Sequence, residues 1–165
     1  MYGYWMGQMS DWTEFRLAIM TTPGGTWFEP PTYQMYGPTR SLTTSQIVLR
    51  NGGFGDLAAK GYHSRALEYD AQLTMPDPRY KGWRILPGMG NSGNTLEGVW
   101  GMGVGVVEQA DPAEAGFFRY MHRLCSGNER VSLGGDPEYS FFFLPDVPER
   151  PRTFTTTYIP GYGVA

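Results

Sequence analysis

The chain has 165 residues, a net charge of −3 and 41% hydrophobic residues, which suits one domain with a buried core and gives no electrostatic reason to bind nucleic acid. It contains no run of 18 apolar residues and no basic start followed by an apolar run, so we expect no membrane insertion and no secretion signal. The single cysteine, Cys125, excludes an internal disulfide and a multi-cysteine metal site.

The N-terminal half is predicted to be mainly extended. Residues 1–9, MYGYWMGQM, are aromatic and Met-rich without a clear period, which predicts an adhesive N-terminal arm that docks on the chain's own body or on a neighbour. Residues 12–20 fit a strand or a short helix, and the alternation of their apolar residues favours a strand. The β-branched residues over 43–50 predict a second strand. Residues 51–55, NGGFG, predict a turn or a mobile loop. The clearest strand is predicted at 64–75, where apolar and polar residues alternate with a period of two.

Glycine occupies one face of the next predicted strand, 95–107. Gly101, Gly103 and Gly105 fall on one side of it, and the apolar residues between them fall on the other. Because glycine weakens the interior of a strand, a bare glycine face indicates that a backbone or an aromatic ring approaches closely there.

One helix is predicted, over 112–125. Asp111 is a good N-cap, Pro112 suits the first helical position, and Glu114 forms a capping-box-like pair with Asp111. An apolar stripe follows at helical spacing: Phe117, Phe118, Met121, Leu124 and Cys125.

The C-terminal part is predicted to return to β structure. Strands are expected at 129–133, 139–144 and 152–158, and 159–165 is expected to form a C-terminal arm. These elements predict a single domain, 1–165, with a mainly β fold. Its core would be a β-sandwich or barrel, with one α-helix at about 112–125 and extended terminal arms.

Two acidic residues are the main catalytic candidates. Residues two apart on a strand project from the same face, so Glu68 and Asp70 would bring their carboxylates within the spacing that a retaining glycosidase uses. The segment 68–72, EYDAQ, resembles the Glu-x-Asp-x-Glu strand of jelly-roll β-glucanases, with Gln72 in place of the third acid. The resemblance implies a small glycoside hydrolase, and a solvated strand face is the alternative.

Other signatures of chemistry are incomplete. His122 and Cys125 share one helix face, but the cysteine lies on the apolar stripe and is expected to be a buried, inert thiol. His63 is expected to be a partly exposed ring at the start of a strand. Residues 88–93, GMGNSG, match GxGxxG, yet a proline precedes them and a strand follows, which favours a plain glycine loop. We expect no enzyme activity, no metal and no cofactor.

The composition favours a protein that buries surface against other subunits. The chain has 11 Tyr, 9 Phe, 5 Trp and 9 Met, and 11 Arg against 2 Lys. Aromatics, Met and Arg are enriched in protein interfaces and Lys is depleted, while a GC-rich genome is the other explanation of the Arg excess. The predicted interface residues lie in the arms, the Pro/Gly loops and the helix: Tyr2, Tyr4, Trp5, Met6, Tyr33, Tyr36, Arg119, Arg123, Tyr158 and Tyr162.

A local resemblance points to viral particles. The segments 54–56 (FGD), 61–65 (GYHSR) and a strand that ends at 75–76 (MP) resemble the FGDGYxxR-then-strand pattern of minor tail proteins of tailed phages, with 57–60 interrupting it. In general character the chain also resembles tail tube and tail-tip subunits. The resemblance implies a virion protein, made in the host cytoplasm, whose β-edges, loops and arms join copies of itself and other assembly subunits.

The predicted function is therefore that of a structural subunit of a larger assembly, a phage tail or head–tail component. A carbohydrate-binding β-sandwich is an alternative, because Trp27, Tyr33 and Tyr36 in Pro/Gly loops would also stack on sugars. The small glycoside hydrolase is a further alternative.

Overall fold

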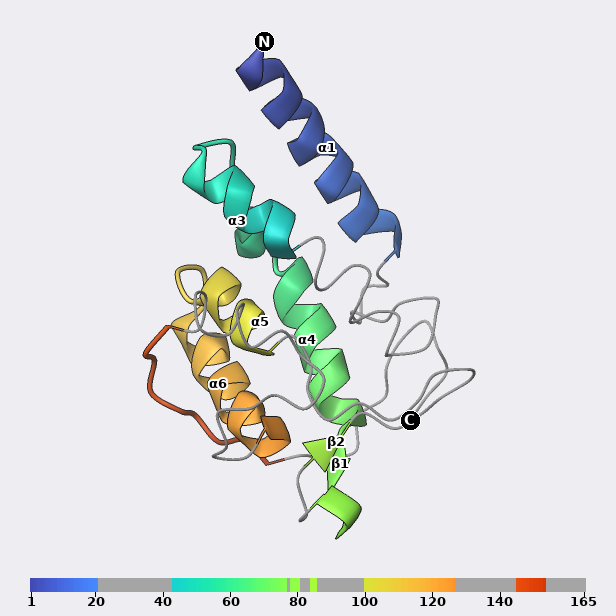
Figure 1. Ribbon diagram of the computed structural model, residues 1–165, viewed down its shortest axis with the longest axis vertical. Coiled ribbons are helices and arrows are strands. Elements are labelled where there is room, and N and C mark those ends of the chain that lie inside the picture. Colours follow the sequence, from blue (N-terminus) through green and yellow to red (C-terminus); the bar gives the residue numbers. More distant parts are fainter. Residues whose placement is uncertain (21–42, 77, 81–83, 86–99, 127–144, 154–165) are drawn as a thin grey trace.

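The computed structural model describes residues 1–20, 43–76, 78–80, 84–85, 100–126 and 145–153. Most of them are helical: α1 (Tyr2–Met20), α3 (Thr43–Asn51), α4 (Tyr62–Leu73), α5 (Trp100–Val107) and α6 (Pro112–Ser126). The other described elements are two 3-10 turns, η2 (Leu57–Lys60) and η3 (Pro78–Tyr80), and two short strands, β1 (Met75–Pro76) and β2 (Arg84–Ile85). In Figure 1, α4, α5 and α6 form the body, and α3 and α1 extend from one end of it.

The fold is mainly α, so the predicted β-sandwich or barrel is wrong. The segments 12–20, 43–50 and 64–75, predicted as strands, lie largely in α1, α3 and α4, and the glycine-rich segment contributes α5. Residues 2–9 belong to α1 and do not form an extended arm. The strands predicted at 129–133 and 139–144, most of the strand at 152–158 and the arm at 159–165 lie outside the described residues.

The described sheet is a small antiparallel pair below α4. Met75 of β1 lies opposite Ile85 of β2. Arg84 Nε donates to Thr74 Oγ1 at 2.8 Å, and Thr74 Oγ1 donates to Ala71 O at 2.8 Å. These bonds connect the last turn of α4 to the strands, so they fix the position of the pair beneath the helix.

The helix predicted at 112–125 is confirmed as α6. Asp111 Oδ1 accepts hydrogen bonds from the backbone N–H groups of Ala113 and Glu114 at 3.1 and 3.0 Å, which satisfies two of the donors that a helix start leaves unpaired. The Asp111 N–H donates to Val107 O at 2.7 Å, so it is not the partner of the Glu114 side chain in a capping box. The core side of α6 consists of buried residues: Ala115, Phe117, Phe118, Met121 and Cys125.

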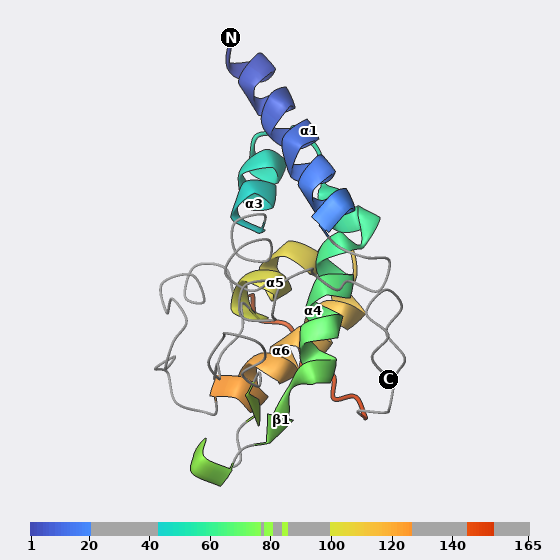
Figure 2. The same cartoon turned by 90° about the vertical axis from the view of Figure 1, so that its right-hand side faces the viewer.

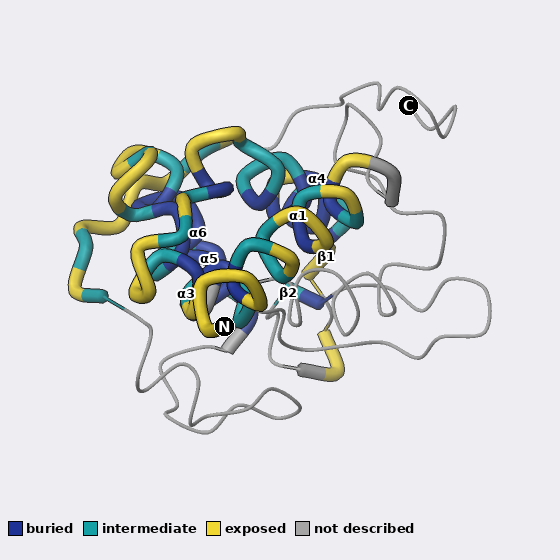
Figure 3. The backbone as a smooth tube through the Cα atoms, turned by 90° about the horizontal axis from the view of Figure 1, so that it is seen from above, coloured by how far each residue is buried: buried dark blue, intermediate teal, exposed yellow. Residues whose placement is uncertain are grey.

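The main core lies where α4, α5 and α6 meet, and Figure 3 shows the buried segments gathered there. The middle helix, α5, packs against α3, α4 and α6. A Cβ added at Gly103 would overlap the Leu67 side chain, so α4 approaches α5 more closely than a larger residue allows. The glycine pattern therefore marks a close approach, but the approaching group is an aliphatic side chain packed on a helix.

A polar network joins α3 to the end of α5. Asp56 Oδ1 accepts hydrogen bonds from Gln46 Nε2 at 2.9 Å and from Arg50 Nη2 at 3.2 Å. The Arg50 guanidinium also donates to the carbonyls of Gly105 and Val106 in the last turn of α5. Because the last carbonyls of a helix lack partners and carry the negative end of its dipole, the cation satisfies both their hydrogen bonding and their charge.

The turn predicted at 51–55 is confirmed. Phe54 N donates to Leu49 O at 2.9 Å and Gly53 N donates to Arg50 O at 3.0 Å, which are the two bonds of a Schellman motif at the end of α3. Gly53 has a φ of 76°, a left-handed conformation that glycine adopts without strain.

The N-terminal helix α1 rests on α3 through one face. Met6, Thr13 and Leu17 are buried and share one side of the helix. Met6 and Leu17 pack with Leu49 of α3 and Leu57 of η2 in a second, smaller core. Figure 2 shows α1 running past α3, with its N-terminal end beyond the rest of the described chain.

The strand predictions failed because alternation over a short segment also fits one side of a helix. Over 62–73 the chain has no β-branched residue and is rich in helix formers, a signal that favours α4. Over 43–50, by contrast, half of the residues are β-branched. There the burial of Gln46 and Leu49 against neighbouring elements outweighs the local preference.

We expect Gly103→Ala to lower the free energy of unfolding by about 1–3 kcal/mol, because the new methyl group overlaps the Leu67 side chain in a filled core. Gly7→Ala in α1 is the matched control, since no neighbouring heavy atom lies within 4 Å of its added Cβ. Alanine there favours the helix by about 1 kcal/mol. Urea unfolding followed by circular dichroism measures both variants. A Gly103→Ala variant that is as stable as Gly7→Ala would contradict the close packing of α4 on α5.

Candidate functional site

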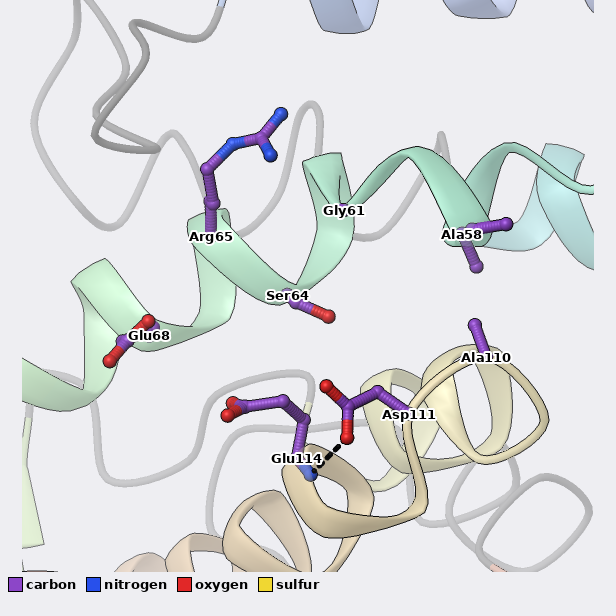
Figure 4. Close-up of a pocket in the computed structure, with 9 residues that line it drawn as sticks. Ala58, Gly61, Ser64, Arg65, Glu68, Ala110, Asp111 and Glu114 are labelled. Carbon is purple, nitrogen blue, oxygen red and sulfur yellow. Dashed lines mark hydrogen bonds between the residues drawn. The ribbon is translucent and has the colours of Figure 1, made fainter.

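A polar cleft of about 320 Å³ opens between α4 and the turn that joins α5 to α6. Its lining residues come from η2, α4 and the start of α6: Ala58, Ala59, Gly61, Ser64, Arg65, Glu68, Ala110, Asp111 and Glu114. Figure 4 shows Ser64 facing Asp111 and Glu114 across the cleft, while Arg65 points away from it. Three carboxylates and one hydroxyl therefore border the opening.

The carboxylates of this cleft are engaged within the chain. Arg152 forms an ion pair with Glu114 and a second one, at 3.8 Å, with Glu68. The same guanidinium lies 4.4 Å from the centre of the Phe117 ring. Asp111 caps α6. We therefore assign the cleft a structural role, in which its acids hold α4, α6 and the segment 145–153 together.

The structure separates the two carboxylates predicted as a catalytic pair. Residues two apart on an α-helix point about 200° apart. Glu68 accordingly lies exposed at the cleft, whereas Asp70 is buried on the core side of α4 with 2% exposure. The prediction that they share a face is wrong, because it assumed a strand. A retaining glycosidase needs both carboxylates on one substrate, which this placement does not provide.

Asp70 is a buried carboxyl without a compensating charge among the described residues. Its Oδ1 has no hydrogen-bond partner, and burial raises the pKa of the carboxyl well above its ordinary value. The folded chain therefore favours the protonated form, and ionisation of Asp70 favours the unfolded chain.

His122 and Cys125 do not form an activated pair. Cys125 is buried with 1% exposure, as predicted. Burial lowers the pKa of His122 to about 4, with a further lowering by the charge of Arg119 and an opposing effect of Glu149. An imidazole that is neutral near pH 7 does not stabilise a thiolate by charge. His63, predicted to be partly exposed, is buried on α4.

An apolar surface runs along the solvent side of α1, opposite the face that packs on α3. We call it the aromatic stripe, and it consists of side chains that are at least half exposed: Tyr4 (64%), Trp5 (64%), Trp12 (51%) and Phe15 (59%). The Tyr4 and Trp5 rings meet edge to face at 5.4 Å, and Arg16 stacks over Trp12 at 4.8 Å. Exposed turns of α1 are visible in Figure 3. Such a helix face is typical of a surface that a second molecule covers.

The residues predicted to form an interface fall in different places. Tyr2, Tyr4 and Trp5 are exposed on α1, and the Tyr2 ring also contacts Phe54 edge-on at 5.7 Å. Met6 is buried in the chain's own smaller core. Four of the predicted residues lie outside the described ranges: Tyr33, Tyr36, Tyr158 and Tyr162.

The two arginines predicted for the interface lie on α6, away from the aromatic stripe. Arg123 Nε donates to both carboxylate oxygens of Glu149 at 2.9 Å, and its guanidinium also stacks on Tyr120 at 5.2 Å. Arg119 is half-buried and lowers the pKa of the neighbouring His122. Both arginines therefore act on groups of their own chain: Arg123 on Tyr120 and Glu149, and Arg119 on His122.

Sequence reasoning missed Trp12 and Phe15 as surface residues. A strand places them on opposite faces, whereas a helix places residues three apart on the same side. The spacing of Trp5, Trp12 and Phe15 could have placed them on one helix face, because steps of seven and three residues match the a and d positions of a heptad.

No protein-family model matches the chain, and neither a curated protein nor a solved structure gives a significant match. Among the described residues, no helix is both long enough and apolar enough to cross a membrane. The same part of the chain contains no group of three or more His, Cys, Asp or Glu residues placed to hold a metal ion. The aromatic stripe is therefore the surface on which a functional proposal can be built.

We expect Asp70→Asn to stabilise the fold increasingly as the pH rises above about 4, because the amide stays neutral while the wild-type carboxyl ionises more readily in the unfolded chain. The difference in unfolding free energy should grow by at most about 1.4 kcal/mol per pH unit. Urea unfolding at pH 4, 5.5 and 7 measures it, with Asp146→Asn at an exposed position as the control. A difference between Asp70→Asn and wild type that stays constant with pH would contradict the burial of an ionisable carboxyl.

Proposed function

We propose that the protein is a structural subunit that joins copies of itself and other subunits of a larger assembly through the aromatic stripe of α1. The observation that carries this proposal is the exposure of four large aromatic side chains on one face of a single helix. The opposite face of α1 is already buried against α3 and η2. A helix that is apolar on both sides is typical of one whose two sides are both covered.

Burial of the stripe is large enough to matter for association. A fully buried side chain of this size contributes about 1.5–3 kcal/mol, so the four rings, each about half exposed, would contribute roughly 3–6 kcal/mol per copy. A pair of copies buries both stripes, which gives roughly 6–12 kcal/mol. Association costs about 4–15 kcal/mol in lost translational and rotational freedom. The stripe alone therefore supports a weak pair, and it becomes effective where each subunit makes several contacts at once, as in an assembly.

We also propose that this assembly is the virion of a tailed phage, on the resemblance of residues 54–76 to minor tail proteins. In this segment Phe54 packs beneath α1, and Asp56 caps η2 by accepting from Ala58 N at 3.0 Å. The segment thus supports the helix that carries the stripe. In this form of the proposal α1 replaces the β-edges as the joining element, because the described strands have two residues each.

The alternatives that depended on a β fold are withdrawn. A carbohydrate-binding β-sandwich requires a sheet architecture that the described residues do not form. The hydrolase requires Glu68 and Asp70 on one face, and they lie on different sides of α4. We propose a role without catalysis, supported by the engagement of the cleft carboxylates with Arg152 and with the start of α6.

We expect the wild-type chain to exceed 18.5 kDa in solution as its concentration rises, and the double variant Trp5→Gln/Trp12→Gln to stay at that mass over the same range. The reason is the loss of the two largest rings of the stripe. Light scattering over a concentration series measures the mass. Met75→Gln is the matched control, because it removes an exposed apolar side chain, 48% accessible, far from the stripe.

Circular dichroism must show the same helical signal for the double variant and the wild type. A wild-type chain that stays monomeric at every concentration would overturn the proposal, and so would a double variant that assembles like the wild type. Negative-stain images of rings or tubes, in which pairs joined through the stripe make further contacts, would support the virion assignment. Images in which nothing larger than such a pair forms at any concentration would count against it.

A further inference from the structure

Three of the four rings of the aromatic stripe, all but Tyr4, belong to a regular seam along α1. Its positions follow one another at steps of three and four residues, the a and d spacing of a coiled coil. The seam consists of Trp5, Gln8, Trp12 and Phe15, all exposed. With Trp5 and Trp12 at a positions, Asp11 takes a g position and Arg16 takes an e position, one on each flank of the seam.

The flanking charges are not paired within the described chain. Asp11 is exposed and makes no ion pair with a described residue. Arg16 stacks on Trp12, and its Nε is buried without a hydrogen-bond acceptor in the described ranges. By contrast, the other charged residues of α1 and η2 are used: Glu14 pairs with Lys60. One acid and one base therefore border the seam without a partner of opposite charge among the described residues.

Two copies of α1 can pair along this seam in two directions, and the charges distinguish them. In a parallel pair, g positions of one helix lie beside e positions of the other, so Asp11 meets Arg16 of the second copy twice across the two-fold axis. In an antiparallel pair, g lies beside g, so Asp11 meets Asp11 of the second copy. Opposite charges attract in the first arrangement, and like charges repel in the second.

The polar residue of the seam favours the same direction. In a parallel pair Gln8 meets Gln8 of the second copy, and the two amides can donate and accept hydrogen bonds with each other. In an antiparallel pair Gln8 would lie beside Trp12, whose indole offers one donor and no acceptor. A single polar residue in an apolar seam is a known means of specifying how helices pair.

We propose that the occupant of the stripe is a second copy of this chain, bound in parallel through α1, with Asp11 paired to Arg16 of the second copy on both flanks. This inference rests on the proposed assembly function and specifies the partner and orientation at that same surface. It makes the seam an isologous, two-fold contact.

The orientation is tested with the variant Gln8→Cys. In a parallel pair the two introduced thiols face each other at one level of the seam, so mild oxidation should join most of the chains into disulfide-linked dimers. The native Cys125 is buried and does not compete. Ala113→Cys, at an exposed position on α6, is the matched control and should stay monomeric on a non-reducing gel.

The charge pairing is tested by reversal. Asp11→Arg and Arg16→Asp should each weaken self-association about tenfold or more, because each places like charges on both flanks of the pair. An equimolar mixture of the two variants should restore association, since every flank then holds one Arg and one Asp. Light scattering measures all three samples, and circular dichroism confirms that the helical signal is unchanged.

The outcomes separate this inference from the assembly function. If the wild type assembles and Trp5→Gln/Trp12→Gln does not, but Gln8→Cys gives no cross-linked dimer, then assembly through the stripe stands and parallel pairing is overturned. If Asp11→Arg and Arg16→Asp, each measured alone, associate as strongly as the wild type, the charge pairing is also overturned. If the wild type remains monomeric, both proposals fail.

Discussion

The guanidinium of Arg50 links the smaller core to the larger one. It donates to Asp56 and to the carbonyls of Gly105 and Val106, so it connects α3 to the end of α5. Only 16% of its side chain is exposed. Removing one partner would leave buried donors or acceptors unsatisfied, which costs more than a hydrogen bond contributes. The contact therefore holds the smaller core against the larger one.

This connection determines where α1 stands. The helix packs on α3 and η2 through Met6 and Leu17, while α4, α5 and α6 bury most of the remaining apolar surface among themselves. No part of the main core reaches the outer side of α1, where Trp5 and Trp12 are exposed. Because the two cores are separate, the outer face of α1 stays uncovered. The proposed association of copies through the aromatic stripe depends on this exposed face.

The candidate surface was predictable in composition but not in geometry. Aromatic enrichment in the first nine residues pointed to the segment that carries Tyr4 and Trp5, because composition does not depend on the secondary structure. Trp12 and Phe15 were missed and Met6 was misplaced, because each assignment requires knowing which side of a helix faces the chain itself. Glu68 and Asp70 were assigned to one face for the same reason. A strand, with a period of two, places them on the same side, whereas a helix, with a period of 3.6, places them on different sides.

The sequence by itself determined the features that depend on local chemistry. The cap at Asp111, the apolar side of α6, the turn that Gly53 allows and the buried state of Cys125 follow from a few neighbouring residues, and all are present. The tertiary structure decided the rest of the described fold. Short alternating segments satisfy a strand and a helix about equally, and β-branched residues in 43–50 oppose the helix that forms there. Contacts between elements distant in the sequence, such as Leu67 on Gly103, supply the free energy that selects the helices.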